Sequence, residues 1–274
     1  MLGLLLLQVL SSCLWLGHSE VSLSFASCRQ FFYAGAPPNR ALDAPSSVKI
    51  CQRYSNSYHF ATLYDRRRRI PVYSAYIYYQ GFGTRSKSWF VEPQLINSSF
   101  PKQMDTEESI RARYKIRPQI MGRNQALNQD YSHLQGLNRG HLSPSGHQRG
   151  QNSKTATFTL TNIVPQHAAL NMGTWNNYEK TTMAHRTKNC TTTYVITGAV
   201  PGKSYISNNR VNVPSHIWSA ACCVVGTRPK KAWGAIAEND KDKVEVLSLG
   251  DLEARLTQFY EGEKIMLFTN ACPR

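Results

Sequence analysis

The sequence predicts an α+β fold, in which helices pack on one mixed or antiparallel β-sheet. Several segments are rich in β-branched and aromatic residues, as strands are. Two longer stretches have a helix-like pattern, and they do not alternate regularly with the strands as they would in a parallel sheet. No internal repeat or long low-complexity linker divides the 274 residues, so we expect residues 20–274 to form a single domain.

The individual elements follow from local composition. Residues 69–79 predict a long strand, and residues 89–93 predict a shorter one that Pro93 ends, because proline donates no ladder hydrogen bond. Further strands are expected at residues 155–164, 194–200, 217–225 and 233–237. Helices are expected at about 170–187 and 251–259, loops with short helices at 97–130, and turns with short apolar runs at 28–64.

The first residues have the pattern of an export signal. Residues 2–16 are nearly all apolar but too few to span a bilayer comfortably, and Gly17-His18-Ser19 gives a small-x-small cleavage pattern. We therefore expect residues 1–19 to be a signal peptide. No later stretch approaches the length of a membrane helix, so the mature protein is expected to be secreted and extracellular, without a membrane span.

The cysteines agree with an oxidising compartment. Cys13 would leave with the signal, and the six that remain are Cys28, Cys51, Cys190, Cys222, Cys223 and Cys272. Geometry disfavours a bridge between the adjacent Cys222 and Cys223, which still leaves twelve of about 15 pairings open. A zinc site is a weaker alternative, because no C-x2-C pair exists. Sequons at Asn97 and Asn189 predict a glycoprotein, although a bridge at Cys190 would disfavour the second.

The charge balance predicts a polyanionic partner. Lys and Arg number 32 against 17 Asp and Glu, a formal net charge of +15. Charged residues make up only 18% and hydrophobic residues 41%, which excludes a disordered polyelectrolyte or a coiled coil. Solubility of a secreted protein is the alternative reason for a basic chain. The run Arg66–Arg69 has the same two interpretations, as an anion contact or as a solvated strand entrance.

Two short segments carry residues suited to chemistry. In residues 138–146, Arg139 offers a fork for phosphate oxygens and His141 accepts a proton near neutral pH. In residues 170–179, Asn171, Trp175 and Glu179 are four apart and would share one helix face. The plain alternatives are a loop with an incidental histidine, and an amphipathic helix with a core tryptophan and a solvated carboxylate.

These segments resemble the DNA/RNA non-specific endonucleases, also called ββα-metal nucleases. Residues 138–142 (NRGHL) are similar to the family's D-R-G-H signature, and residues 159–166 (TLTNIVPQ) to its L-S-N-x-x-P-Q block. Asn171 matches the family's L-N pair, and Trp175 with Glu179 matches its W-x-x-L-E pattern. The resemblance covers nearly all of the mature chain and implies an embedded ββα-metal motif.

The resemblance also implies roles for individual residues. His141 corresponds to the general base that activates water, and Asn171 to the single direct protein ligand of Mg²⁺, with Mn²⁺ or another divalent ion as substitutes. Glu179 corresponds to the acidic residue that orients water on the metal. Asn162 corresponds to the asparagine that helps to hold the base and the metal region, and Arg139 to the motif arginine near the phosphate.

Substrate contacts are less sharply defined by the resemblance. Lys87 lies where some members carry a phosphate-contacting arginine, and Arg85 is its rival for that role. The first motif residue is Asn138 instead of Asp, so it carries no charge to stabilise a nearby cation. Activity is still expected, because the base, the metal ligand and the acidic residue are all present.

The implied reaction is hydrolysis of DNA and RNA phosphodiester bonds to 5′-phosphate products. Water is the nucleophile in place of a ribose 2′-OH, so both polymers are expected substrates. Two alternatives stay open. The first is a catalytically weak or silent secreted protein that binds polyanions, and the second is a metal-free ribonuclease that spares DNA and ignores chelators.

Overall fold

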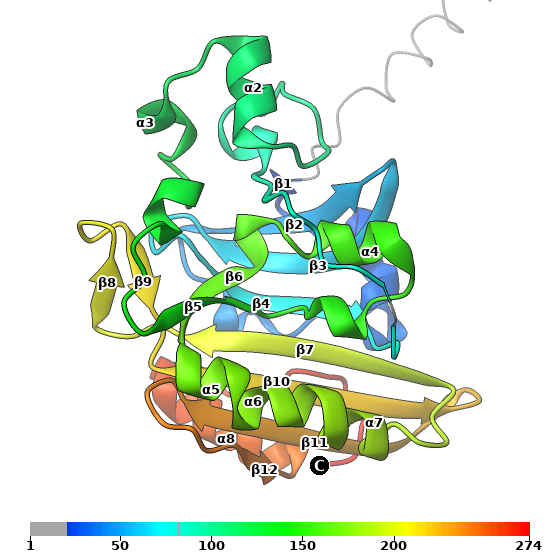
Figure 1. Cartoon of the computed structure of the whole chain (residues 1–274). Helices are drawn as coiled ribbons and strands as arrows, with labels where there is room; N and C mark the ends of the chain where they lie inside the picture. The colour runs from blue at the N-terminus through cyan, green and yellow to red at the C-terminus, as the bar shows by residue number, and fades with distance from the viewer. Residues whose placement is uncertain (1–20, 82) are drawn as a thin grey trace, which may run out of the picture.

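The computed structural model describes residues 21–81 and 83–274, so the predicted signal peptide lies outside the described residues. Its centre is an eight-stranded, fully antiparallel sheet with the spatial order β1-β2-β3-β4-β7-β10-β11-β12 (Figure 1). The strands are β1 (Val21–Ser22), β2 (Ser47–Tyr54), β3 (Ser57–Asp65), β4 (Ile70–Ile77), β7 (Thr192–Val200), β10 (His216–Val225), β11 (Arg228–Glu238) and β12 (Glu245–Leu247). This architecture confirms the predicted α+β class.

Two small hairpins and a set of mostly short helices complete the chain. The hairpins are β5 (Leu137–His141) with β6 (Ile163–His167), and β8 (Ser204–Ile206) with β9 (Val211–Val213). The α-helices are α2 (Glu107–Tyr114), α3 (Pro118–Met121), α4 (Gly150–Ala156), α5 (Ala168–Met172), α6 (Thr174–Asn177), α7 (Met183–Arg186) and α8 (Leu249–Tyr260). A π-helical turn spans Tyr178–Thr182, and 3-10 turns span Ala26–Phe31, Tyr33–Gly35, Arg40–Leu42, Pro93–Leu95, Asn128–Tyr131, Ser145–His147 and Leu160–Asn162.

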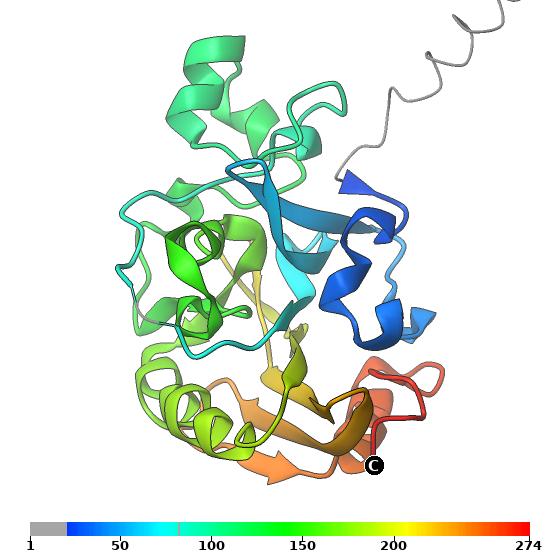
Figure 2. The ribbon, with the colours of Figure 1, turned by 90° about the vertical axis from the view of Figure 1, so that its right-hand side faces the viewer.

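The sheet is covered on both faces, which gives three layers (Figure 2). Trp218 of β10 packs on one face with the N-terminal 3-10 turns and with α8, in a cluster that includes Leu252. Trp233 of β11 packs on the other face in a cluster with Phe158 and Tyr178. Neighbouring side chains of a strand point to opposite faces of the sheet, and both faces are covered. The central strands are therefore buried on both sides, which explains their long apolar runs.

Most predicted elements are confirmed, and two strands are wrong. Strands β4, β7, β10 and β11 and helix α8 lie where composition placed them. Residues 155–164 instead end helix α4, form a 3-10 turn and reach β6 only at Ile163. Residues 89–93 form only isolated bridges at Phe90 and Val91. In both segments the apolar side chains fill the core from irregular backbone, so composition alone gives the wrong backbone conformation.

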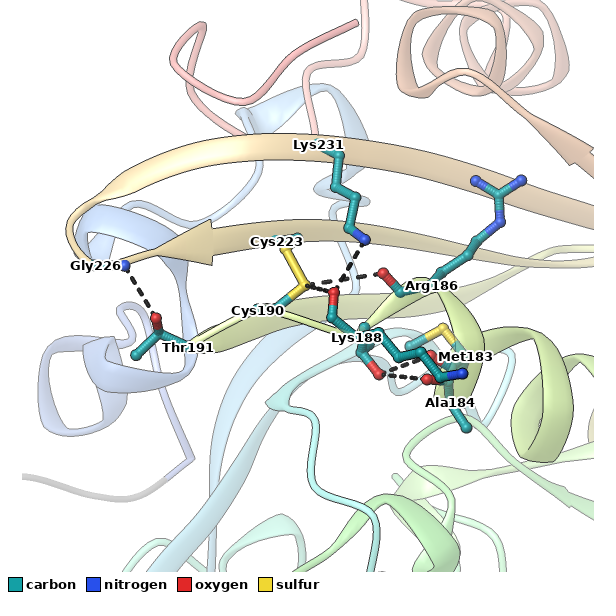
Figure 3. Close-up of a disulfide and its surroundings, with 10 residues drawn as sticks. Met183, Ala184, Arg186, Lys188, Cys190, Thr191, Cys223, Gly226 and Lys231 are labelled. Carbon is teal, nitrogen blue, oxygen red and sulfur yellow. Dashed lines mark hydrogen bonds between the residues drawn. A yellow bond between two sulfur atoms is a disulfide. The ribbon is translucent and has the colours of Figure 1, made fainter.

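Three disulfides tie the outer layers to the sheet. They are Cys28–Cys51, Cys190–Cys223 and Cys222–Cys272. The adjacent pair on β10 separates because neighbouring side chains face opposite sides of the sheet, so each meets a partner in a different layer. Figure 3 shows the bridge that joins Cys190, just after α7, to Cys223. No helix of the described residues is long and apolar enough to cross a membrane.

Candidate active site

The hairpin β5–β6 and the helix α5 that follows it form a β-β-α unit on one face of the large sheet. Side chains alternate along β5, so Arg139 and His141 lie on one face and Asn138 and Gly140 on the other. A Cβ atom on Gly140 would lie 2.7 Å from the Cβ atom of Gln166 in β6, so the paired strands leave no room for a side chain at this position. Arg139 and His141 therefore project from the same face of a closely paired strand.

A pocket of about 740 Å³ opens in front of this unit. It gathers five of the predicted site residues from distant parts of the chain, namely Arg85, Arg139, His141, Asn171 and Glu179. Its remaining walls are Tyr78, Gln80, Gly81, Gly83, Pro144, Ser145, Gly146, His147, Lys154, Met172, Asn176 and Lys180. Two predicted residues, Asn162 and Lys87, do not line it.

The imidazole of His141 is held between aromatic rings. Its ring centroid lies 4.9 Å from that of Phe158 and 5.7 Å from that of Trp89. Its Nε2 atom is buried and has no hydrogen-bond partner among the described residues. Burial, and to a lesser degree the charge of Arg85, lower the pKa of His141 to about 3. The ring is therefore neutral at physiological pH and has a nitrogen free to accept a proton.

The guanidinium of Arg139 is fixed on three sides. It lies 4.5 Å from the ring centroid of Trp89 and 5.3 Å from that of Tyr131. It also donates hydrogen bonds to the side-chain and backbone oxygens of Asn128, at 3.0 and 3.3 Å. These contacts leave a cation of restricted orientation at the pocket wall.

The helix that carries Asn171 and Glu179 is broken between them. Helix α5 ends at Met172, Gly173 adopts a non-helical conformation, and α6 then leads into the π-helical turn. The predicted alignment nevertheless holds at its second half, where the indole Nε1 of Trp175 donates to Glu179 Oε1 at 3.1 Å. A π-helical turn shifts the positions that follow it, and such turns are frequent at functional sites.

Burial dominates the ionisation of Glu179. It raises the pKa of this carboxyl to about 8, against smaller opposing effects of the Trp175 hydrogen bond and of Lys180. A cation bound nearby would favour the ionised form. The carboxyl thus lies in the pocket as a group that a metal ion would deprotonate.

The comparisons with known proteins agree with this geometry. The model of the DNA/RNA non-specific endonuclease family matches residues 38–259. The chain belongs to this family. It is 36% identical over 262 residues to the human endonuclease domain-containing 1 protein, which covers 92% of this chain and 49% of the relative. The mouse protein of the same name is 32% identical over 257 residues, with 90% and 48% covered.

More distant members share the fold. Human mitochondrial endonuclease G is 32% identical over 148 residues, which covers 49% of this chain and 48% of that protein. A solved structure of an EndoG/EndoGI complex matches with a TM-score of 0.51 and 21% identity, and covers 77% of this chain and 83% of that chain. This chain spans about half the length of the curated relatives it matches.

Asn162, from the second family block, lies behind the pocket and organises it. It is fully buried, and its Oδ1 accepts hydrogen bonds from the backbone N of Ser143 and the hydroxyl of Ser74, at 2.9 and 2.8 Å. Its Nδ2 donates to the carbonyl oxygens of Ser143 and Thr157, both at 3.0 Å. Since Ser143 follows His141 by two residues, Asn162 fixes the segment that leaves the histidine.

The two candidate phosphate contacts separate clearly in space. Arg85 lines the pocket, and its guanidinium lies 5.4 Å from the Phe158 ring that also packs on His141. Lys87 is exposed outside the pocket. Asn138, the position where the family has Asp, faces away from the pocket on β5, so its missing charge is not at the pocket wall.

His147 is a structural histidine that lines the pocket. Its Nε2 hydrogen-bonds the backbone oxygen of Glu179 at 2.9 Å, and its Nδ1 lies 3.0 Å from the hydroxyl of Tyr76. Burial lowers its pKa to about 4, so the neutral ring donates to the π-helical turn and accepts from the tyrosine. This hydrogen bond holds the backbone of Glu179 in position.

Several residues that shape the pocket gave no recognisable sequence signal. Asn128, Tyr131 and Trp89 position the motif arginine from segments that read as loop or as short strand. Lys154 lies in residues 150–156, which form a helix so short that no periodicity marks it. Their placement depends on long-range packing.

Proposed function

We propose that this chain is a secreted, Mg²⁺-dependent, sugar-non-specific endonuclease that hydrolyses phosphodiester bonds in DNA and RNA. The observation that carries the proposal is the convergence of His141, Arg139, Asn171 and Glu179 on one pocket. The net charge of +15 supports it, since it draws a polyanion toward that pocket.

The donor set of the pocket fits Mg²⁺. The described residues hold no group of three or more His, Cys, Asp or Glu that would form a closed transition-metal site. Asn171 and Glu179 offer instead an amide oxygen and a carboxylate, and Mg²⁺ is typically held by few protein oxygens, waters and substrate phosphates. Bound there, the ion would stabilise negative charge on the phosphate oxygens and on the departing 3′ oxygen.

The side chains of the pocket have separate roles in the reaction. His141 accepts the proton of the attacking water at the unprotonated nitrogen of its neutral ring, and the rings of Phe158 and Trp89 hold the imidazole in place. Arg139 and Arg85 place positive charge close to the phosphate oxygens on which negative charge builds up during the reaction. A water nucleophile makes the sugar irrelevant, and contacts to the backbone make the base sequence irrelevant.

We also propose that the chain is exported from the cell. Three disulfides in the described residues require oxidising conditions, and residues 1–19 have the composition of a signal peptide. Asn97 and Asn189 are both exposed, but Asn189 directly precedes the bridged Cys190, so we propose Asn97 as the glycosylated sequon.

Digestion of plasmid DNA and of RNA tests the proposal. The expected result is cleavage of both polymers with Mg²⁺ or Mn²⁺, 5′-phosphate ends, and no cleavage with EDTA. Retention of both polymers uncut with every divalent ion, with binding preserved, would identify a silent polyanion-binding protein. Cleavage of RNA alone in EDTA would identify a metal-free ribonuclease and contradict the proposal.

A further inference from the structure

One buried cation of the pocket has no role in the family motifs. Lys154, on helix α4, is only 4% exposed, yet it lines the same pocket as His141 and Arg85. Its Nζ atom donates hydrogen bonds to the backbone oxygens of Gly81 and Ser145, both at 3.0 Å. An ammonium has three N–H groups, so one donor is left beyond the two bonds that it makes to described residues.

The charge of Lys154 has no counterion among the described residues. Among the described residues it takes part in no salt bridge, and burial lowers the pKa of its ammonium without a compensating acidic neighbour. Glu179 is the only acidic residue in the sequence between Asp130 and Glu238. Buried lysines are normally paired, because an unpaired charge away from water is costly.

The loop above Lys154 is shaped around its side chain. A Cβ atom on Gly83 would lie 2.9 Å from the lysine Cδ, and one on Gly81 would lie 3.3 Å from its Nζ and 1.9 Å from the backbone oxygen of Gln148. Gly83 also has a φ of +141°, which side chains rarely adopt. Gly81 and Gly83 let the backbone approach the lysine side chain closely, which holds the ammonium at the pocket wall.

We propose that Lys154 binds a substrate phosphate, and that its ammonium donates its remaining hydrogen bond to a non-bridging phosphate oxygen. The inference rests on the proposed function, because it takes a nucleic acid as the ligand of the pocket. A phosphodiester supplies the one negative charge that the surroundings of Lys154 lack. With Arg85 and Arg139 it completes a pocket whose cations meet the nucleic acid backbone.

The competing explanation is a structural clamp, in which Lys154 only ties the Gly81 loop to Ser145. Lys154→Met keeps the length and apolar stem of the side chain but removes the charge and the donors. Lys203→Met is the matched control, because Lys203 is an exposed lysine outside the pocket and loses the same charge. Lys154→Arg retains the charge.

The test measures binding of a fluorescein-labelled single-stranded oligonucleotide by anisotropy, in EDTA and over a range of salt. One lost phosphate contact reduces the slope of log K against log salt by about 0.7 for a single strand. We expect this change and weaker binding for Lys154→Met, and the wild-type slope for Lys154→Arg and Lys203→Met. An unchanged slope for folded Lys154→Met, with a lowered Tm, would show a clamp only and overturn the proposal.

A measurement on the wild-type chain covers the case in which Lys154→Met does not fold. The hydrogen-bonded ammonium of Lys154 is followed by nitrogen-detected NMR while the same oligonucleotide is added in EDTA. We expect the resonance of the Lys154 ammonium to shift until the oligonucleotide saturates the protein. A resonance that does not shift would overturn the inference. Plasmid cleavage by the wild-type chain, assayed in parallel, separates the two proposals. Cleavage together with an unchanged slope for Lys154→Met, or with an unshifted Lys154 resonance, refutes the phosphate-binding role of Lys154 alone. A changed slope or a shifted resonance without cleavage refutes the hydrolytic function alone.

Discussion

Replacing Asn162 by alanine removes four hydrogen bonds from a fully buried carboxamide behind the pocket. The backbone N and O of Ser143 and the backbone O of Thr157 then lose this partner, and each buried polar group left unsatisfied costs about 1–3 kcal/mol. Because single substitutions rarely exceed about 4–5 kcal/mol, we expect the free energy of unfolding to fall by about 3–5 kcal/mol.

The same change should affect turnover through His141. Ser143 lies two residues beyond the histidine, and a shift of about 1 Å at a reacting group costs about 100-fold in rate. The matched control is Asn212→Ala, which removes another fully buried asparagine, one that bonds to Gly202 and Ser204 outside the pocket.

Urea unfolding and kcat at low temperature, where both variants are folded, provide the assay. We expect both variants to lose stability, and only Asn162→Ala to lose about 100-fold in kcat. A folded Asn162→Ala variant with the kcat of the wild type would refute the positioning role of Asn162.

Three further predictions concern the metal, the pH dependence and a disulfide. Asn171→Ala should raise the Mg²⁺ concentration for half-maximal cleavage while leaving oligonucleotide binding in EDTA unchanged; an unaltered Mg²⁺ titration would remove Asn171 from the metal site. Glu92 is buried and its pKa is raised to about 7, so between about pH 4.5 and 7 the folded state binds the extra proton and the free energy of unfolding falls as pH rises. Glu92→Gln should abolish a loss of about 3 kcal/mol over that window in urea unfolding, and a parallel pH profile for both proteins would contradict this. Removal of the Cys190–Cys223 bridge by a double alanine variant should lower the free energy of unfolding by about 2–4 kcal/mol, and an unchanged urea midpoint would contradict the anchoring of α7.

The sequence predicted the elements whose local pattern and final environment agree. Strands β4, β7 and β10 are long β-branched and aromatic runs, and each is a central strand buried on both faces. Strands β2 and β3 were missed, because residues 28–64 were expected to form turns with short apolar runs and these strands bury polar side chains. Gln52 and Thr62, for example, are hydrogen-bonded to each other inside the sheet at 3.2 Å.

The candidate site also has parts that could be predicted from the sequence and parts that could not. The motif residues His141, Asn171 and Glu179 could be selected from spacing and resemblance, and the structure brings them to one pocket. The break at Gly173 and the π-helical turn could not, because they depend on contacts such as Asp242, which accepts hydrogen bonds from Thr174 at 2.7 Å. Such contacts join residues about 70 positions apart and leave no local pattern.

The most direct test of the account is plasmid cleavage by His141→Ala, measured beside oligonucleotide binding in EDTA. The imidazole contributes the proton-accepting nitrogen and no charge, since its pKa of about 3 keeps it neutral. General base catalysis accounts for about 10²–10⁴ in rate, so we expect cleavage to fall by at least about 100-fold while affinity and its salt dependence stay at wild-type values. Cleavage by the variant at the wild-type rate would contradict the central role of this imidazole.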